Sequence, residues 1–96
     1  MIVHVTGTAG AELEDIRRWI ARDNRPRATS FIRELRSRIA GLTATYELYP
    51  IVDSTADGPI HRMNYHEYRI FYQVSGKRID VLGVHQGSRG SPDFSA

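Results

Sequence analysis

The sequence predicts an α+β fold in which an N-terminal strand and a helical hairpin pack on a curved, mainly antiparallel sheet. Apolar residues recur at helical spacing in two consecutive segments, residues 11–22 and 26–42, with only a short break between them. β-branched and aromatic residues then concentrate in three short segments near the C-terminus. With one further strand at the start of the chain, the predicted order is β-α-α-β-β-β.

The composition fits a single globular domain over residues 1–96. Hydrophobic residues make up 41% of the chain and charged residues 25%, which is too apolar for a disordered segment. The lack of cysteine excludes a disulfide-stapled mini-protein, a thiolate zinc site and a thiol nucleophile. No apolar run reaches the roughly 18 residues of a membrane span and no secretory leader is visible, so we expect a cytoplasmic protein with no membrane partner.

The N-terminal quarter of the chain predicts a strand, a turn and a helix. Residues 2–6 are mainly β-branched and predict the strand, and the small residues of 6–10 predict the turn. The helix is predicted over residues 11–22, where the apolar stripe consists of Leu13, Ile16 and Ile20, with Trp19 packing beside it. The three acidic residues of this segment fall in the predicted first turn and its arginines in the second half, which suits the helix dipole.

A second helix is predicted with Pro26 at its first position, where the missing N–H of proline costs nothing. Apolar residues follow at helical spacing over four turns: Ala28, Phe31, Ile32, Leu35, Ile39 and Leu42. The break between the helices is so short that we expect an antiparallel hairpin. The face that carries Phe31, Ile32, Leu35 and Ile39 should pack on the sheet.

The C-terminal half is predicted to be a long connection followed by strands. Residues 43–59 show no sustained period, and we expect this connection to be anchored on the core by Tyr46, Leu48, Tyr49, Ile51 and Val52. Strands are predicted over residues 60–65, 68–74 and 78–85, with a hairpin turn at Ser75 and Gly76. The small, polar residues of 87–96 should form a flexible tail.

Positive charge is concentrated on the predicted hairpin. Twelve of the 13 basic residues are arginine, and eight arginines fall between Arg17 and Arg38, where the only acids are Asp23 and Glu34. A GC-rich coding sequence would favour arginine without any function. A local positive field would instead suit an acidic partner, either a protein or a nucleic acid.

The last three predicted strands, and positions just past them, carry residues that could cleave RNA without a metal. Histidine could transfer protons, arginine could stabilise the phosphorane, and tyrosine could stack on a base. The residues concerned are His61, His66 and His85, Arg62, Arg69 and Arg89, and Tyr65 or Tyr68. A half-exposed sheet shows the same alternation of polar residues without any chemistry. The three histidines have no carboxylate at ligand spacing, so no zinc site is expected.

Three strings in order resemble a family of bacterial proteins. The segment WIARDNRPRATSFIRELRSRI (residues 19–39) resembles the helical hairpin of the RelE/ParE toxins of type II toxin–antitoxin systems. The segment ELYPIV (residues 47–52) resembles the loop that follows this hairpin, and YRIFYQVSGKRIDVLGVHQGSRG (residues 68–90) resembles the C-terminal strands of the family. The resemblance covers nearly the whole chain and implies the fold predicted above.

The resemblance also implies a toxin that is neutralised by a cognate antitoxin with an acidic C-terminal segment. ParE-type members inhibit DNA gyrase without being enzymes, whereas RelE-type members cut mRNA on the ribosome. This chain has one lysine, Lys77, where RelE-type nucleases carry several, and its ending HQGSR is similar to that of ParE-type members. We therefore expect a gyrase inhibitor. The alternatives are a ribosome-dependent, metal-independent mRNA endonuclease, or a degenerate toxin that only binds its antitoxin and helps to autoregulate the operon.

These functional hypotheses lead to the following site predictions. The residues expected to carry toxicity are Arg62, Arg69, His85 and Arg89, with His61, Tyr65 and His66 as weaker candidates. The residues expected to bind the antitoxin are Arg17, Arg18, Arg22, Arg33 and Arg36. No cofactor and no metal is expected.

Overall fold

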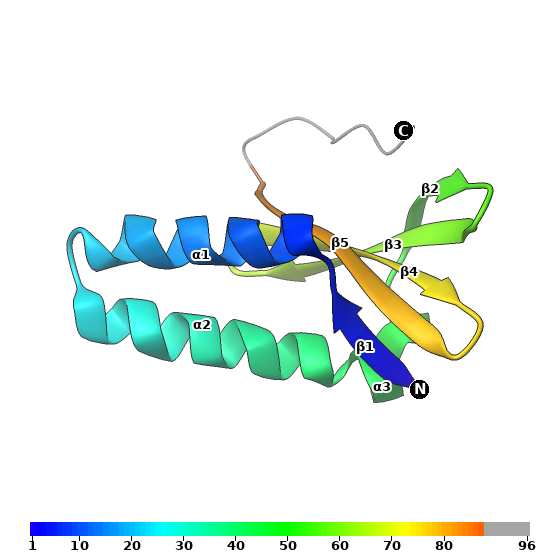
Figure 1. The fold of residues 1–96 in the computed structure, drawn as a ribbon, viewed down its shortest axis with the longest axis horizontal. Helices are drawn as coiled ribbons and strands as arrows, with labels where there is room; N and C mark the ends of the chain where they lie inside the picture. Colours follow the sequence, from blue (N-terminus) through cyan, green and yellow to red (C-terminus); the bar gives the residue numbers. More distant parts are fainter. Residues whose placement is uncertain (88–96) are drawn as a thin grey trace.

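The computed structural model describes residues 1–87, which form a helical hairpin and a five-stranded sheet (Figure 1). The strand order is β1-β5-β4-β3-β2, in which β1 and β5 are parallel and the other neighbours antiparallel. The elements are β1 (Ile2–Val5), α1 (Gly7–Ala21), α2 (Arg25–Ala40), α3 (Leu42–Thr45), the 3₁₀ turn η1 (Tyr46–Leu48), β2 (Ile51–Thr55), β3 (Gly58–Tyr65), β4 (Tyr68–Ser75) and β5 (Arg78–Gln86). The α+β class is confirmed, with one more strand than predicted. Of the predicted flexible tail, residues 88–96 lie outside the described part of the chain.

Helix α1 begins four residues earlier than predicted, so the expected turn over residues 6–10 is wrong. Thr6 is the N-cap, and its Oγ1 accepts a hydrogen bond of 3.2 Å from the backbone N–H of Ala9. The same hydroxyl donates to the carbonyl of Val81 at 2.8 Å, which ties the start of the helix to β5. Because the helix starts at Gly7, none of its acidic residues lies in the first turn, contrary to the prediction.

Helix α2 forms the predicted antiparallel hairpin with α1, and the two lie side by side in Figure 1. Asn24 caps α2, since its Oδ1 accepts from the backbone N–H of Arg27 at 3.0 Å. Pro26 is the second helical residue, one position later than predicted. The sheet extends beyond the end of the hairpin where α1 starts and α2 ends (Figure 1).

The segment predicted as a long connection, residues 43–59, is mostly regular. It contains most of α3, all of η1, and the edge strand β2, which pairs with β3 through a bulge at Val52. Only Tyr46 and Tyr49 of the five predicted anchors pack on the core, whereas Leu48, Ile51 and Val52 are exposed. The edge position explains the failure of the prediction, because a strand without a buried face shows no apolar alternation.

The helices cover one face of the sheet. This face carries Met63, Ile70 and Tyr72, which belong to the buried core. Helix residues Leu13, Phe31, Leu35 and Ile39 pack into the same core, as predicted, and Ile32 is partly buried beside it.

Trp19 contradicts the prediction that it packs in the hairpin, because it is 63% exposed. The guanidinium of Arg22 lies over the Trp19 ring, with its central carbon 5.2 Å from the ring centroid. Within residues 1–87, no helix is both long enough and apolar enough to cross a membrane.

Candidate functional site: the arginine face

Three of the predicted toxicity residues share the sheet face that points away from the core between the sheet and the helices. Arg69 of β4 pairs directly with His85 of β5, and Arg62 of β3 pairs with Phe71 of β4. In a strand, residues two apart point to the same side, so Arg69 and Phe71 share a face with their partners. We call this side of the sheet, defined by Arg62, Arg69, His85 and the buried Phe71 ring between them, the arginine face.

His85 is the most firmly held residue of the arginine face. Its Nε2 lies 3.1 Å from Oε2 of Glu12 on α1, and both side chains are about three-quarters buried, with exposed fractions of 23% and 24%. The other carboxylate oxygen, Oε1 of Glu12, accepts a hydrogen bond of 3.1 Å from the backbone N–H of Val84. The His85 ring also meets Phe71 edge-on, with centroids 5.6 Å apart. The carboxylate of Glu12 therefore holds both the backbone of β5 at Val84 and the imidazole of His85.

Gly83 leaves room for this contact. A Cβ atom built at Gly83 would lie 2.8 Å from Nε2 of His85 and 3.1 Å from Oε1 of Glu12. Any side chain at this position would force one of the two residues to move. Glycine is therefore required here for close approach, and not for its backbone conformation.

The two arginines supply positive charge without a recorded carboxylate partner. Among residues 1–87, no ion pair is recorded for Arg62 or Arg69, and the buried Nε of Arg62 has no hydrogen-bond acceptor there. A hollow of about 310 Å³ lies beside Arg69; its lining is Asn64, His66, Glu67, Tyr68, Arg69, Gln86 and Gly87. Unpaired guanidinium donors suit carboxylate or phosphate groups of a partner.

His61 and Tyr65, two of the weaker candidates, lie on the other face of the sheet. His61 stacks on Tyr72 with centroids 5.0 Å apart, and its Nδ1 lies 2.9 Å from the carbonyl of Tyr49. Tyr65 donates from its hydroxyl to Oε1 of Glu34 on α2 at 2.9 Å. The pKa of Tyr65 is raised, chiefly because this hydrogen bond to a carboxylate favours the protonated phenol. Both residues therefore hold structure together at a distance from the arginine face.

His66 occupies the tight turn between β3 and β4, with a positive φ of 53°. Its ring contacts Phe31 and Tyr65, with centroids 5.7 Å and 4.5 Å away. It also lines the hollow beside Arg69, so its position is intermediate between the core and the arginine face. Within the described residues, no group of three or more metal-binding side chains is gathered in one place. Arg89, the fourth predicted toxicity residue, lies outside the described residues.

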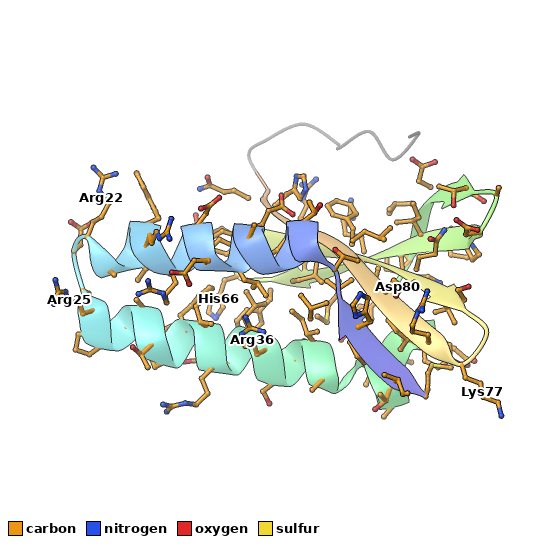
Figure 2. All side chains as sticks on the ribbon, viewed as in Figure 1. Arg22, Arg25, Arg36, His66, Lys77 and Asp80 are labelled. Carbon is orange, nitrogen blue, oxygen red and sulfur yellow. The ribbon has the colours of Figure 1, made fainter. Side chains whose placement is uncertain are left out.

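The arginines predicted to bind the antitoxin are all exposed on the hairpin, but they do not share one environment. Arg17 and Arg18 both pair with Glu14, at 2.6 Å and 3.4 Å. Arg22 lies over Trp19 near the tip of the hairpin, the same end at which Figure 2 shows Arg25. Arg33 and Arg36 on α2 have no recorded ion pair among residues 1–87.

Sequence reasoning missed Glu12, Gly83 and Phe71. Glu12 was interpreted only as a charge in the first turn of a helix, and it lies 72 residues from Val84, the residue whose N–H it accepts. The contact of Phe71 with His85 depends on the pairing of β4 with β5. No local spacing in the sequence indicates either contact.

Comparisons with known proteins agree with this architecture. The profile of the family described as "ParE toxin of type II toxin-antitoxin system, parDE" matches residues 3–90. A solved structure described as "Chromosomal ParDE TA system from P. aeruginosa" is similar with a TM-score of 0.75 at 14% sequence identity, over 90% of this chain and 95% of that chain. At that identity the likeness concerns the fold alone. A comparison with curated protein sequences finds no match.

Proposed function

Because this chain belongs to the ParE toxin family of type II toxin–antitoxin systems, we propose that it inhibits DNA gyrase and is neutralised by a cognate antitoxin. The toxic contact is made by the arginine face, through Arg62, Arg69 and His85. The antitoxin presents an acidic segment to the exposed arginines of the hairpin. Gyrase acts on DNA in the cytoplasm, so the proposed site of action is there.

The composition of the arginine face carries this proposal. Metal-free RNA cleavage needs one group to take the 2′-hydroxyl proton and another to protonate the leaving oxygen. Of the histidine and tyrosine candidates on the strands of residues 1–87, His85 alone shares a face with Arg62 and Arg69, since His61, Tyr65 and Tyr68 lie on the core side. His66 lies in the turn between β3 and β4. A face with two arginines and one proton-transfer group favours binding over chemistry.

One observation favours the endonuclease as a second candidate. A carboxylate that holds an imidazole, as Glu12 holds His85 at 3.1 Å, is the arrangement by which many enzymes orient a general base. Arg69 on the neighbouring strand could then stabilise a phosphorane. This candidate requires a second proton-transfer group, and His66, which lines the hollow beside Arg69, is a described histidine that could supply it.

The experiment compares the two targets directly. The purified chain is added to gyrase in a DNA supercoiling assay and, separately, to ribosomes programmed with mRNA. We expect inhibited supercoiling, relief of that inhibition by the product of the adjacent antitoxin gene, and intact mRNA. The double variant Arg62→Ala/Arg69→Ala is the control that separates the arginine face from unspecific inhibition. Cut mRNA with unaffected gyrase would replace the proposed function by the endonuclease, and no effect on either would favour a degenerate toxin.

A further inference from the structure

Glu12 faces two hydrogen-bond donors at once. Its Oε1 accepts from the backbone N–H of Val84 at 3.1 Å, and its Oε2 lies 3.1 Å from Nε2 of His85. An ionised carboxylate can only accept hydrogen bonds, so Nε2 must carry the proton in this contact. A neutral imidazole has one N–H, and the proton on Nε2 therefore leaves Nδ1 as an acceptor.

The geometry around Gly83 indicates where that acceptor lies. Nε2 and Cδ2 of His85 are the two ring atoms that a Cβ at Gly83 would meet, at 2.8 Å and 3.1 Å. This edge of the ring lies against β5 and Glu12, and Nδ1 is on the opposite edge of the ring. No hydrogen bond from Nδ1 to another residue of the described chain is recorded, and the side chain remains 23% exposed.

We propose that Glu12 is a positioning residue which, with Gly83, holds His85 in the tautomer that presents Nδ1 as a hydrogen-bond acceptor on the arginine face. The group that binds there is a hydrogen-bond donor on an acidic protein surface whose carboxylates meet Arg62 and Arg69. The role in binding rests on the proposed function, whereas the tautomer depends only on the contacts of Glu12.

Replacing Glu12 by glutamine tests this with almost no change of shape. Glutamine has one acceptor and one donor where the carboxylate has two acceptors. The N–H of Val84 can only donate, so the amide oxygen should face it and the amide NH₂ should face Nε2. Nε2 must then accept, and the proton moves to Nδ1. Glu12→Gln should therefore reverse the tautomer of His85 while both hydrogen bonds survive.

The first measurement is the ¹⁵N chemical shift of the two ring nitrogens of His85, taken in the folded chain at a pH where the shifts show a neutral ring. We expect the Nε2–H tautomer in the wild type and the Nδ1–H tautomer in Glu12→Gln. Glu47→Gln, an identical change on η1, should leave the wild-type tautomer. A wild type with the proton on Nδ1, or a tautomer unchanged by Glu12→Gln, would overturn the assignment whatever the target of the toxin.

The second measurement concerns the partner. With a proton on Nδ1, His85 would present a hydrogen-bond donor to the donor group of the partner, and the hydrogen bond between them would be lost. The concentration of Glu12→Gln needed to inhibit gyrase should therefore rise about tenfold, the equivalent of one hydrogen bond. Gly83→Ala should also weaken inhibition, since its Cβ displaces His85 or Glu12. If Glu12→Gln reversed the tautomer but inhibited as well as the wild type, the role in binding would be refuted. Absence of inhibition by the wild type would refute the proposed function and would leave the tautomer result unaffected.

Discussion

Tyr65 on β3 and Glu34 on α2 are joined by a hydrogen bond of 2.9 Å from the phenol hydroxyl to the carboxylate. Glu34 also pairs with Arg27 at 2.7 Å, and both of these side chains are partly exposed to solvent. The hydroxyl of Tyr65 and the guanidinium of Arg27 together lower the pKa of Glu34 from its usual value of 4.5. The hydrogen bond that links β3 to α2 thus involves a carboxyl group, that of Glu34, whose charge depends on pH.

This link should make stability fall in acid. A carboxyl whose pKa is lower in the folded chain contributes stability above its unfolded pKa, and that contribution is lost as the pH falls through the folded value. We therefore expect the free energy of unfolding of the wild type to decline more steeply below about pH 4.5 than that of Glu34→Gln. Urea unfolding at stepped pH measures both slopes, with Glu47→Gln as the matched control. Parallel curves for the wild type and Glu34→Gln would contradict this assignment.

Leu35 should be essential for stability. It is fully buried between α2 and the sheet, so Leu35→Ala should cost about 2–5 kcal/mol. A domain of this size has roughly 5–15 kcal/mol in total, so the variant should lose a large part of its stability, and its toxicity should fall with the fraction of folded chain. Chemical denaturation checks this, and an unchanged midpoint would refute the core assignment.

His61 should behave differently from His85. Removing its contacts with Tyr72 and the Tyr49 carbonyl in His61→Ala should cost about 1–3 kcal/mol of stability. Gyrase inhibition per folded molecule should remain, because His61 lies on the core side of the sheet. Thermal melting and the supercoiling assay separate the two effects. A fully stable His61→Ala chain without activity would place this residue in the functional site.

The arginine face should tolerate loss of the imidazole better than loss of a guanidinium. Arg62→Ala and Arg69→Ala each remove a charge-assisted contact of about 1.5–3 kcal/mol, which corresponds to about 10- to 150-fold in affinity. His85→Gln keeps a hydrogen-bonding group toward Glu12 and should weaken inhibition less than either. Arg25→Ala at the hairpin tip is the control for charge alone. Complete loss of toxicity in a folded His85→Gln chain, together with mRNA cleavage by the wild type, would favour the endonuclease.

Antitoxin binding should depend on the arginines of α2 that have no partner within the described chain. Arg33→Ala and Arg36→Ala should each weaken binding, more so at low salt, whereas Arg17→Ala should do so less because Glu14 already neutralises Arg17. Trp19 is the only tryptophan and is exposed, so its fluorescence can report binding. Equal effects of the three variants would show that total charge matters and position does not.

The sequence by itself determined the helices and the central strands. The spacing of Phe31, Leu35 and Ile39 indicated which side of α2 is buried, and the β-branched and aromatic residues of 68–74 indicated the strand β4. A periodic pattern reports the buried face of its own element, so it needs no knowledge of the neighbour. The same logic failed for β2, which is exposed, and for Trp19, which lies beside the apolar stripe but outside the packed interior.

Only the tertiary structure decided which polar residues act together. Strand pairing set Arg62, Arg69 and His85 on one face, and alternation then necessarily turned His61 to the other. The contact between Glu12 and His85 joins residues that are distant in the chain, through the packing of α1 against the end of β5. Such a contact depends on where two elements meet in space, and the local sequence of neither element contains that information.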